Sequence, residues 1–371
     1  MSYLDRIDLA LGDLAERSLR REVREALPTG VLDFASNDYL GLASDDAVVA
    51  ALHGASRLGS GGSRLLSGAY PEQVALEREL AAWTGRERAL LFSSGYLAAL
   101  GAIVTLAPFV ARIRSDAQLH ACGIDAIRLT SVPRKIYPHD AYDAPRDGVP
   151  TMVVTESIFG MSGKRVDIGA LLARLGPSDI LIVDEAHALG IAGAHGAGCC
   201  AGVADPRLII VGTLSKAFGG LGGFVAGPAS AIAYLVTAAR SFIFDTSLPP
   251  AIAAAMHASL QRIRGEFGDR ARARLQHNVA SLVCALRAHD PALPDAGAPI
   301  VPIVIGDAAE AFAIGRALEA RGIFAPALRP PTVAAGASQL RVTVRANHTS
   351  ADIGAFVDAF ADVRYARNIR R

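Results

Sequence analysis

The chain has 371 residues and a nearly balanced charge, with 37 basic and 36 acidic side chains and a formal net charge of +1. This balance argues against a nucleic-acid groove or an anionic-membrane binder, because either would need a basic surplus. Apolar residues make up 51% and charged residues 20% of the chain, as in ordinary globular proteins. The length predicts two domains, or one large domain with an appendage.

The first 27 residues alternate apolar and charged positions at helical spacing, which predicts an amphipathic helix and no secretory signal. Residues 89–111 carry no charge, but serines, glycines and a proline interrupt them. We expect a buried strand, a tight loop and a buried helix there, not a membrane span. The four cysteines form no CxxC pair, which argues against a zinc site or disulfide framework and favours a reducing cytoplasm.

Short apolar runs alternate with helical patterns through the middle of the chain. The strands predicted from these runs are Arg88–Phe92, Met152–Thr155, Ile180–Val183, Leu208–Gly212 and Gly223–Ala226. Near-continuous apolar strands separated by helices indicate an α/β fold, with a mostly parallel sheet sandwiched by helices. Such sheets bind ligands beyond the carboxyl ends of their strands.

The last part of the chain predicts a smaller α+β domain. Its expected strands are 300–305 and 339–344, and its expected helices are 308–321 and 350–365. We therefore predict four regions along the chain: an N-terminal helix and arm at 1–45, a large domain at 46–250, connecting helices at 251–290 and a C-terminal α+β domain at 291–371.

The tetrapeptide Asp184-Glu185-Ala186-His187 follows a buried strand, where a parallel sheet places its site. A capping aspartate and a packed histidine would also explain it. The same letters occur in the magnesium-binding box of DEAH helicases. That function requires a phosphate loop of the form GxxxxGK(S/T), however, and residues 160–165 have the wrong spacing. The tetrapeptide alone leaves these interpretations open.

Lys216 follows another buried strand, after the hydroxyl residues Thr213 and Ser215 and before a pair of glycines. A lysine near the mouth of an apolar pocket reacts readily with aldehydes to form a Schiff base. The alternative is a surface lysine whose stem covers apolar neighbours. This motif alone does not decide between them.

The segment Ser93-Ser94-Gly95-Tyr96 turns from a strand into a helix, and the amides of a helix N-terminus form an anion site. The two serines are also ordinary N-caps. Together the three motifs supply a phosphate cradle, an acid beyond one strand and a Schiff-base lysine beyond another. A cofactor with a phosphate, an aldehyde and a basic ring nitrogen satisfies all three, and pyridoxal 5′-phosphate is that cofactor.

With these motifs the sequence resembles the α-oxoamine synthases, which are pyridoxal-phosphate enzymes of the aspartate-aminotransferase fold type. The resemblance runs nearly end to end and includes residues 34–42, 59–68, 184–187, 212–216 and 246–250. It implies a fold type I transferase whose large domain binds the cofactor. Members of the family join an amino acid to an acyl thioester and release carbon dioxide.

Residues 329–333 and 339–343 most resemble the branch of this family that joins L-alanine to a pimeloyl thioester in biotin biosynthesis. The thioester is carried by coenzyme A or by an acyl carrier protein, and the resemblance does not choose between them. It implies a cytoplasmic homodimer with shared active sites. The alternatives are a sister synthase that uses glycine, serine or another acyl thioester, and a catalytically silent relative.

The resemblance also implies the residues that hold the cofactor. Lys216 would bond its aldehyde and later move the substrate α-proton, Asp184 would pair with the pyridine nitrogen, and His120 would stack on the ring face. His187 would hydrogen-bond the phenolic oxygen. The phosphate contacts implied by the family are the amides of Gly95 and Tyr96, the hydroxyl of Thr213 and, from the partner subunit, Thr246.

The substrate contacts come from the same resemblance. Arg341 would bind the carboxylate of the amino acid as a fork-shaped pair. Arg329 and Thr332 belong to a loop expected to close over the acyl substrate, and Arg21 or its neighbour Arg20 would be the acyl-site arginine.

One position departs from the family pattern. Gly160 stands where relatives commonly carry a serine that touches the cofactor or the substrate. The departure leaves the fine tuning of the site, and the identity of the substrate, open.

Overall fold

The computed structural model describes residues 1–23, 26–143, 147–291, 293 and 297–368. The chain forms two compact units. The large unit comprises 37–160 and 164–275, and the small unit comprises 1–36, 161–163 and 276–371. The N-terminal arm thus groups with the C-terminal residues. The four-part division made from the sequence stays a prediction about domain organisation.

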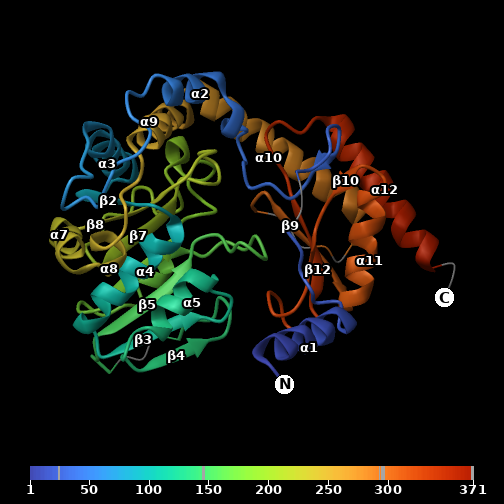
Figure 1. Ribbon diagram of the computed structural model, residues 1–371, viewed down its shortest axis with the longest axis horizontal. Coiled ribbons are helices and arrows are strands. Elements are labelled where there is room, and N and C mark those ends of the chain that lie inside the picture. The colour runs from blue at the N-terminus through green and yellow to red at the C-terminus, as the bar shows by residue number, and fades with distance from the viewer. Residues whose placement is uncertain (24–25, 144–146, 292, 294–296, 369–371) are drawn as a thin grey trace. The chain divides into compact units, whose positions relative to one another are not determined.

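The large unit is built on a seven-stranded sheet with the strand order β2-β8-β7-β6-β5-β3-β4 (Figure 1). Only β8 runs antiparallel to its neighbours. The mostly parallel sheet predicted from the sequence is therefore confirmed. Its strands are β2 (Arg88–Phe92), β3 (Arg112–Asp116), β4 (Arg134–Tyr137), β5 (Thr151–Glu156), β6 (Ile180–Asp184), β7 (Leu208–Thr213) and β8 (Gly223–Gly227).

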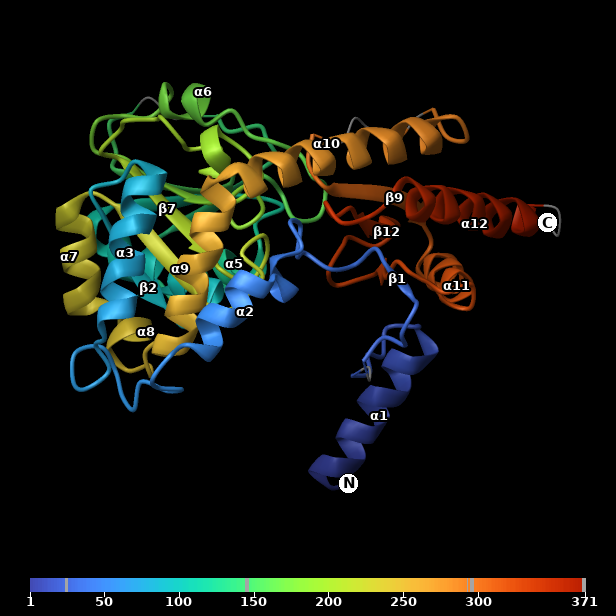
Figure 2. The same cartoon turned by 90° about the horizontal axis from the view of Figure 1, so that it is seen from above.

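Helices cover both faces of this sheet. Helices α4, α5, α7 and α8 contribute to one apolar cluster with it, and α3 contacts β2 and β8 and packs beside α9 (Figure 2). The helices of the large unit are α2 (Asp46–His53), α3 (Pro71–Thr84), α4 (Gly95–Leu106), α5 (Ala121–Arg128), α6 (Ile168–Leu172), α7 (Ala229–Ala238), α8 (Arg240–Ile243) and α9 (Pro250–Arg264), with 3-10 turns at Leu42–Ser44, Ala107–Phe109 and Ala194–Gly196.

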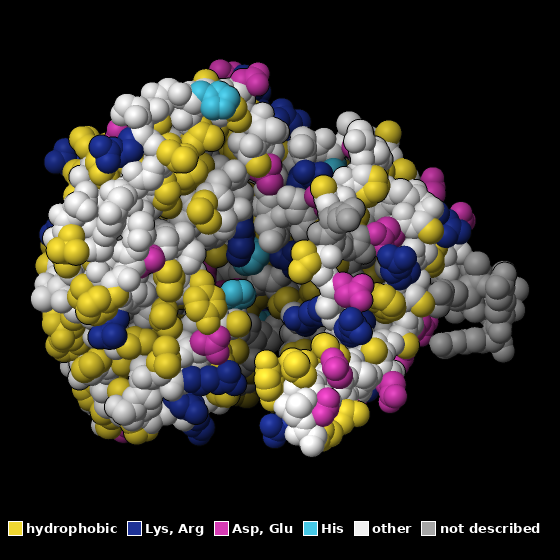
Figure 3. All heavy atoms as spheres, in the orientation of Figure 1, with side chains coloured by type: hydrophobic (Ala, Val, Ile, Leu, Met, Phe, Trp, Pro, Cys, Tyr) yellow, Lys and Arg dark blue, Asp and Glu magenta, His cyan; other side chains and the backbone are white. Residues whose placement is uncertain are grey.

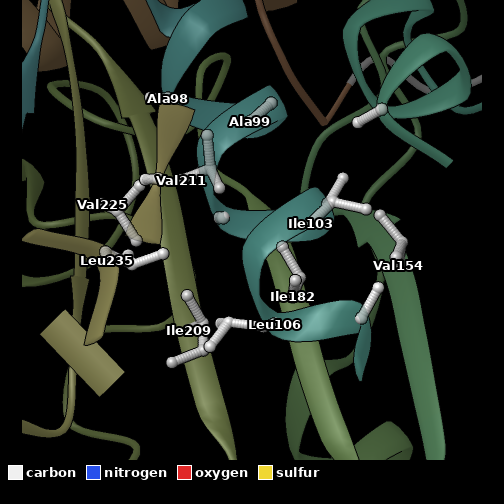
Figure 4. Packing of buried hydrophobic residues seen from close by; sticks show 14 of the residues in the cluster. Ala98, Ala99, Ile103, Leu106, Val154, Ile182, Ile209, Val211, Val225 and Leu235 are labelled. Atoms are coloured by element: carbon white, nitrogen blue, oxygen red, sulfur yellow. The ribbon is translucent and has the colours of Figure 1, made fainter. Parts of the chain in front are cut away.

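Helix α4 is the element that aligns the candidate site, because its own position is set by the core. Small residues such as Ala98 and Ala99 let it approach the sheet, while Ile103 and Leu106 lie against strands β5 to β7 (Figure 4). Each large aliphatic side chain buried in this way contributes about 1.5–3 kcal/mol. This packing fixes the N-terminus of the helix near the end of β7.

The uncharged stretch 89–111 is a buried strand, a short loop and a buried helix, as predicted. Among the described residues, no helix combines the length and the apolar character needed to cross a membrane. The strands β3 and β4 were not predicted. Neither strand is an apolar run, because four of their nine residues are arginine or lysine. Strand β4 is also an edge strand, and its first three residues are exposed.

The small unit has an antiparallel sheet, β11-β12-β9, and a two-stranded parallel pair, β1-β10. Helix α11 packs on the antiparallel sheet and α12 packs on α11. The α+β pattern predicted for the C-terminal residues is present. The elements are α1 (Tyr3–Glu16), β1 (Leu32–Asp33), β9 (Ile300–Gly306), α11 (Ala308–Glu319), β10 (Ile323–Phe324), β11 (Ala327–Leu328), β12 (Ser338–Thr343) and α12 (Ser350–Asn368), and α10 (Glu266–Arg287) begins in the large unit and ends in this one.

The helix predicted over the first 27 residues is shorter than expected and ends at Glu16. The reason is local, because Ser18 adopts a left-handed backbone with φ of 55°, a conformation that terminates helices. Residues 24 and 25 lie outside the described part of the chain.

Candidate active site

Two acids end neighbouring strands of the large unit. Asp184 is the last residue of β6 and Glu156 the last of β5, and the two are paired in register. One oxygen of Asp184 accepts a hydrogen bond from the amide of Ala186 at 2.8 Å, and the other lies 3.8 Å from the thiol of Cys122. The second oxygen is only weakly engaged by the thiol, so it can accept a stronger donor such as a ring N–H.

Glu156 was given no role from the sequence, yet it joins two loops of the site. Its Oε1 accepts from the amide of His120 at 2.7 Å, and its Oε2 accepts from the amide of Gly160 at 3.2 Å. Burial, and then the charge of Asp184, raise the pKa of Glu156 to about 8. Near neutral pH the carboxyl of Glu156 is therefore mainly protonated and neutral.

His120 begins helix α5, and its side chain accepts from the amide of Cys122 at 3.3 Å. Burial lowers the pKa of this imidazole, and the nearby charge of Lys216 lowers it further while that of Asp184 opposes the shift. The ring is therefore neutral near pH 7 and lies within electrostatic range of both charged groups. A neutral ring is suited to stacking on an aromatic face.

Lys216 lies three residues beyond the end of β7, and its Nζ is 2.7 Å from Nε2 of His187. The other ring nitrogen of His187, Nδ1, is 2.7 Å from the hydroxyl of Tyr39. Tyr39 is fully buried and His187 nearly so. The structure thus brings together the lysine and the histidine predicted from two separate motifs, and adds a tyrosine that the sequence analysis did not single out.

Helix α4 begins at Gly95, where the sequence predicts an anion cradle. Ser94 caps it, with its side chain accepting from the amide of Leu97 at 3.2 Å and its carbonyl from Ala98 at 3.0 Å. The first two amides, those of Gly95 and Tyr96, have no acceptor within the helix. A side chain at Gly95 would lie 3.0–3.1 Å from the Thr213 side chain, so the glycine lets the Thr213 hydroxyl border the cradle.

Glu185 has a structural position instead of a catalytic one. It is fully buried, and its carboxyl oxygens accept from the amides of Cys199 and Cys200 at 3.2 and 3.1 Å. Burial raises the pKa of this carboxyl. A carboxyl turned into the core and held by backbone amides does not suit the magnesium-binding role of a nucleotide hydrolase.

Thr246 lies in the loop between α8 and α9 and is exposed in the single chain. Its neighbour Ser247 anchors this loop, because its amide donates to Gly62 at 3.1 Å and its hydroxyl to Gly68 at 2.6 Å. The exposed position agrees with a residue that acts on another subunit, and that role stays a prediction.

The predicted acyl-site residues meet within the small unit. Arg21 donates to the hydroxyl of Thr332 at 2.8 Å, and Arg329 lies with its guanidinium 4.5 Å from the centre of the Phe312 ring. A cavity of about 710 Å³ is lined by Arg20, Arg21 and Arg329, among other residues. Burial, and then the positive charge of Arg21, lower the pKa of Arg329.

Of the two candidate arginines, Arg21 is the one that contacts the Thr332 loop, whereas Arg20 lies 3.7 Å from Glu22. Arg341, on strand β12 of the same unit, donates to the hydroxyl of Thr343 at 3.0 Å. On the face of the molecule drawn in Figure 3, both acidic and basic side chains are exposed.

The family model for aminotransferase class I and II matches residues 29–360. The 8-amino-7-oxononanoate synthase of Burkholderia vietnamiensis is 41% identical over 381 residues, covering 94% of this chain and 93% of that protein. The solved serine palmitoyltransferase of Sphingomonas wittichii has a TM-score of 0.88 at 27% identity, with full coverage of both chains. The solved 8-amino-7-oxononanoate synthase of Francisella tularensis has a TM-score of 0.75 at 30% identity, covering 91% of this chain and 99% of that one.

Proposed function

The chain belongs to the class I and II aminotransferase family, and from this premise we propose that it makes 8-amino-7-oxononanoate for biotin biosynthesis. It condenses L-alanine with a pimeloyl thioester and releases carbon dioxide and the thiol, with pyridoxal 5′-phosphate as cofactor. The fold is that of fold type I pyridoxal-phosphate enzymes. The observation that carries the proposal is the grouping of Lys216, His187 and Asp184 at the ends of adjacent strands.

The donor set suits the cofactor. A phosphate needs several N–H and O–H donors, which the amides of Gly95 and Tyr96 and the hydroxyl of Thr213 supply. A protonated pyridine nitrogen needs a carboxylate, and Asp184 has an oxygen held only by a long thiol contact. An aldehyde needs an amine, which Lys216 supplies.

When bound, the cofactor withdraws electrons from the α-carbon of an attached amino acid and so makes that carbon acidic. The Nζ of Lys216 then removes the α-proton of L-alanine. The α-carbon forms a bond to the acyl carbonyl carbon, and the thiolate leaves. Loss of the alanine carboxyl carbon as carbon dioxide is followed by return of a proton to the same α-carbon, and Lys216 is the proposed donor.

Other residues bind and orient the reactants. Asp184 would hold the cofactor at its ring nitrogen, where a carboxylate would keep that nitrogen protonated and the ring electron-withdrawing. Arg341 binds the alanine carboxylate, for which a planar guanidinium is suited. Arg21, Arg329 and Thr332 bind the distal carboxylate of the pimeloyl chain. Burial, and then the charge of Arg21, lower the pKa of Arg329, so this pair of guanidiniums gains from a neutralising anion.

The active form that we propose is a homodimer in which Thr246 serves the partner's phosphate site, and its exposure in the single chain supports this. We propose a cytoplasmic location, with which four free cysteines agree. Coenzyme A and an acyl carrier protein are both retained as carriers of the thioester.

Thiol release from pimeloyl-coenzyme A tests the proposal, with L-alanine present and then replaced by glycine or serine. We expect release that requires L-alanine and a product with the mass of 8-amino-7-oxononanoate. Release with serine or glycine alone would instead favour a sister synthase. That alternative is supported by the fold shared with a serine palmitoyltransferase, but identity of 41% over most of both chains favours the alanine enzyme.

A further inference from the structure

The imidazole of His187 occupies the space where a side chain at position 160 would lie. A Cβ built on Gly160 would be 3.0 Å from Cδ2 of the ring, 3.3 Å from Cε1 and nearer still to Nε2. The backbone of Gly160 is not left-handed, so alanine would fit its conformation. The obstacle to a side chain here is therefore the ring of His187.

Neither partner in this contact can move away easily. The ring is buried and is held at Nδ1 by the hydroxyl of Tyr39, a residue that is itself fully buried. The backbone of Gly160 is held by its amide, which donates to the carboxyl of Glu156, and Glu156 is also buried. A methyl group at position 160 would therefore displace the ring instead of being absorbed by relaxation elsewhere.

The hydrogen bonds around the ring run in one direction. The carbonyl oxygen of Asn37 can only accept, so the Tyr39 hydroxyl donates to it at 3.2 Å. The oxygen of Tyr39 then accepts from Nδ1–H of His187. This leaves a lone pair on Nε2, which accepts from the Nζ of Lys216 at 2.7 Å. In this arrangement Nε2 of His187 is the acceptor that is directed at the lysine.

We propose that Gly160 is a positioning residue for the reactive amine. Because it has no side chain, the His187 ring lies with Nε2 against Lys216, and the Tyr39–Asn37 pair holds that ring in the accepting tautomer. Gly160 acts through His187 and not by touching the reactants. The inference rests on the proposed function in one respect, that Lys216 is the lysine that bonds the cofactor.

The test is a double-mutant cycle of Gly160→Ala and His187→Ala, with Gly169→Ala as the matched control. A Cβ at Gly169, in helix α6, meets nothing nearer than 3.4 Å. The first readout uses cofactor-free protein labelled with ¹⁵N-histidine. The chain has nine histidines, and His187 is assigned by the loss of its signals in His187→Ala. The second readout is the pH dependence of the visible absorption of the lysine-bound cofactor.

We expect Gly160→Ala to move the Nε2 signal of His187 and to shift the apparent pKa of the visible band by about half a unit or more, the effect of losing one hydrogen bond. In the His187→Ala background the same substitution should produce no further shift, because no ring remains to be displaced. Gly169→Ala should leave both readouts unchanged.

Two results would overturn the proposal. If Gly160→Ala shifts the apparent pKa of the visible band equally in the parent and in the His187→Ala background, Gly160 acts through the backbone. If the Nε2 signal of His187 does not move in Gly160→Ala, the missing side chain at position 160 does not determine where the ring lies. The labelled cofactor-free protein reports independently of turnover. If thiol release requires L-alanine but the Nε2 signal of His187 does not move in Gly160→Ala, this inference alone is refuted. If the signal moves but the protein releases no thiol, only the proposed reaction is refuted.

Discussion

Glu156→Gln should change how the stability of the large unit depends on pH. Burial, and then the charge of Asp184, raise the pKa of Glu156 from 4.5 in the unfolded chain to about 8 in the native state. Between these two pH values the native protein keeps a proton that the unfolded chain has lost. Raising the pH through this window therefore favours unfolding, and the free energy of unfolding falls with rising pH.

The magnitude follows from the size of the shift. Each unit of pKa difference corresponds to about 1.4 kcal/mol, so the whole window from pH 4.5 to about 8 is worth about 5 kcal/mol. Glutamine does not titrate and removes this slope. The NH₂ group of glutamine also faces one of the two backbone amides that donate to the Glu156 carboxyl. The loss of that hydrogen bond costs about 1–3 kcal/mol at every pH.

The free energy of unfolding of the parent protein, measured relative to that of Glu156→Gln, should therefore fall by about 1.4 kcal/mol per pH unit. Urea unfolding of cofactor-free protein at pH 5.5, 6.5 and 7.5 measures this, at one fixed protein concentration. Fluorescence of Trp83, the single tryptophan and a buried residue of α3, reports on the large unit. Glu266→Gln, at a carboxyl that is 81% exposed, is the control and should leave the slope unchanged.

A difference between parent and Glu156→Gln that stays constant across these pH values would refute the reasoning. It would mean that Glu156 is ionised in the native state throughout this pH range.

Three further outcomes follow from the site. Lys216→Ala should abolish both the visible absorption of the bound cofactor and thiol release. Lys135→Ala, on the exposed edge strand β4, is the control and should change neither. Spectra recorded with added pyridoxal phosphate, together with the thiol-release assay, test this. Asp184→Asn should retain the fold but lower kcat by about 10²–10⁴, measured by thiol release beside a melting curve. Arg21→Ala should raise KM for the pimeloyl thioester tenfold or more, which is about 1.4 kcal/mol. Arg321→Ala is the control, because this exposed arginine of the same unit is not among the residues that line the cavity, and it should leave KM unchanged. Equal effects of the two substitutions would contradict the proposed subsite.

The parts of the fold that could be predicted are those where burial dictates composition. Strands β5 to β8 are buried almost throughout, so their sequences are apolar runs that stand out from the helices between them. Strand β3 also lies inside the sheet, yet Arg112 is held at its end by Asp147 and Thr151. An arginine satisfied by tertiary partners cannot be distinguished by sequence pattern from an arginine in solvent.

The same distinction governs the site. Asp184 and Lys216 could be predicted because each follows an apolar strand, and the carboxyl ends of parallel strands meet at one edge. Tyr39 could not, because its contact with His187 joins residues 148 positions apart, and a tyrosine after a polar turn carries no local sign of burial. The need for a glycine at position 160 could not be predicted from the sequence either, because it depends on where the ring of His187 lies.

Glu156, unlike Tyr39, could have been assigned to the site from the sequence. Consecutive strands of a parallel sheet are commonly neighbours, and both β5 and β6 end in an acid, so their last residues could have been paired from the sequence. Two carboxyls at that spacing cannot both ionise cheaply, and the one that is more buried takes the proton. Glu156 is the buried member and Asp184 the partly exposed one. The raised pKa of Glu156 makes it a neutral neighbour of the residue proposed to face the ring nitrogen, and from there it holds the loops of His120 and Gly160.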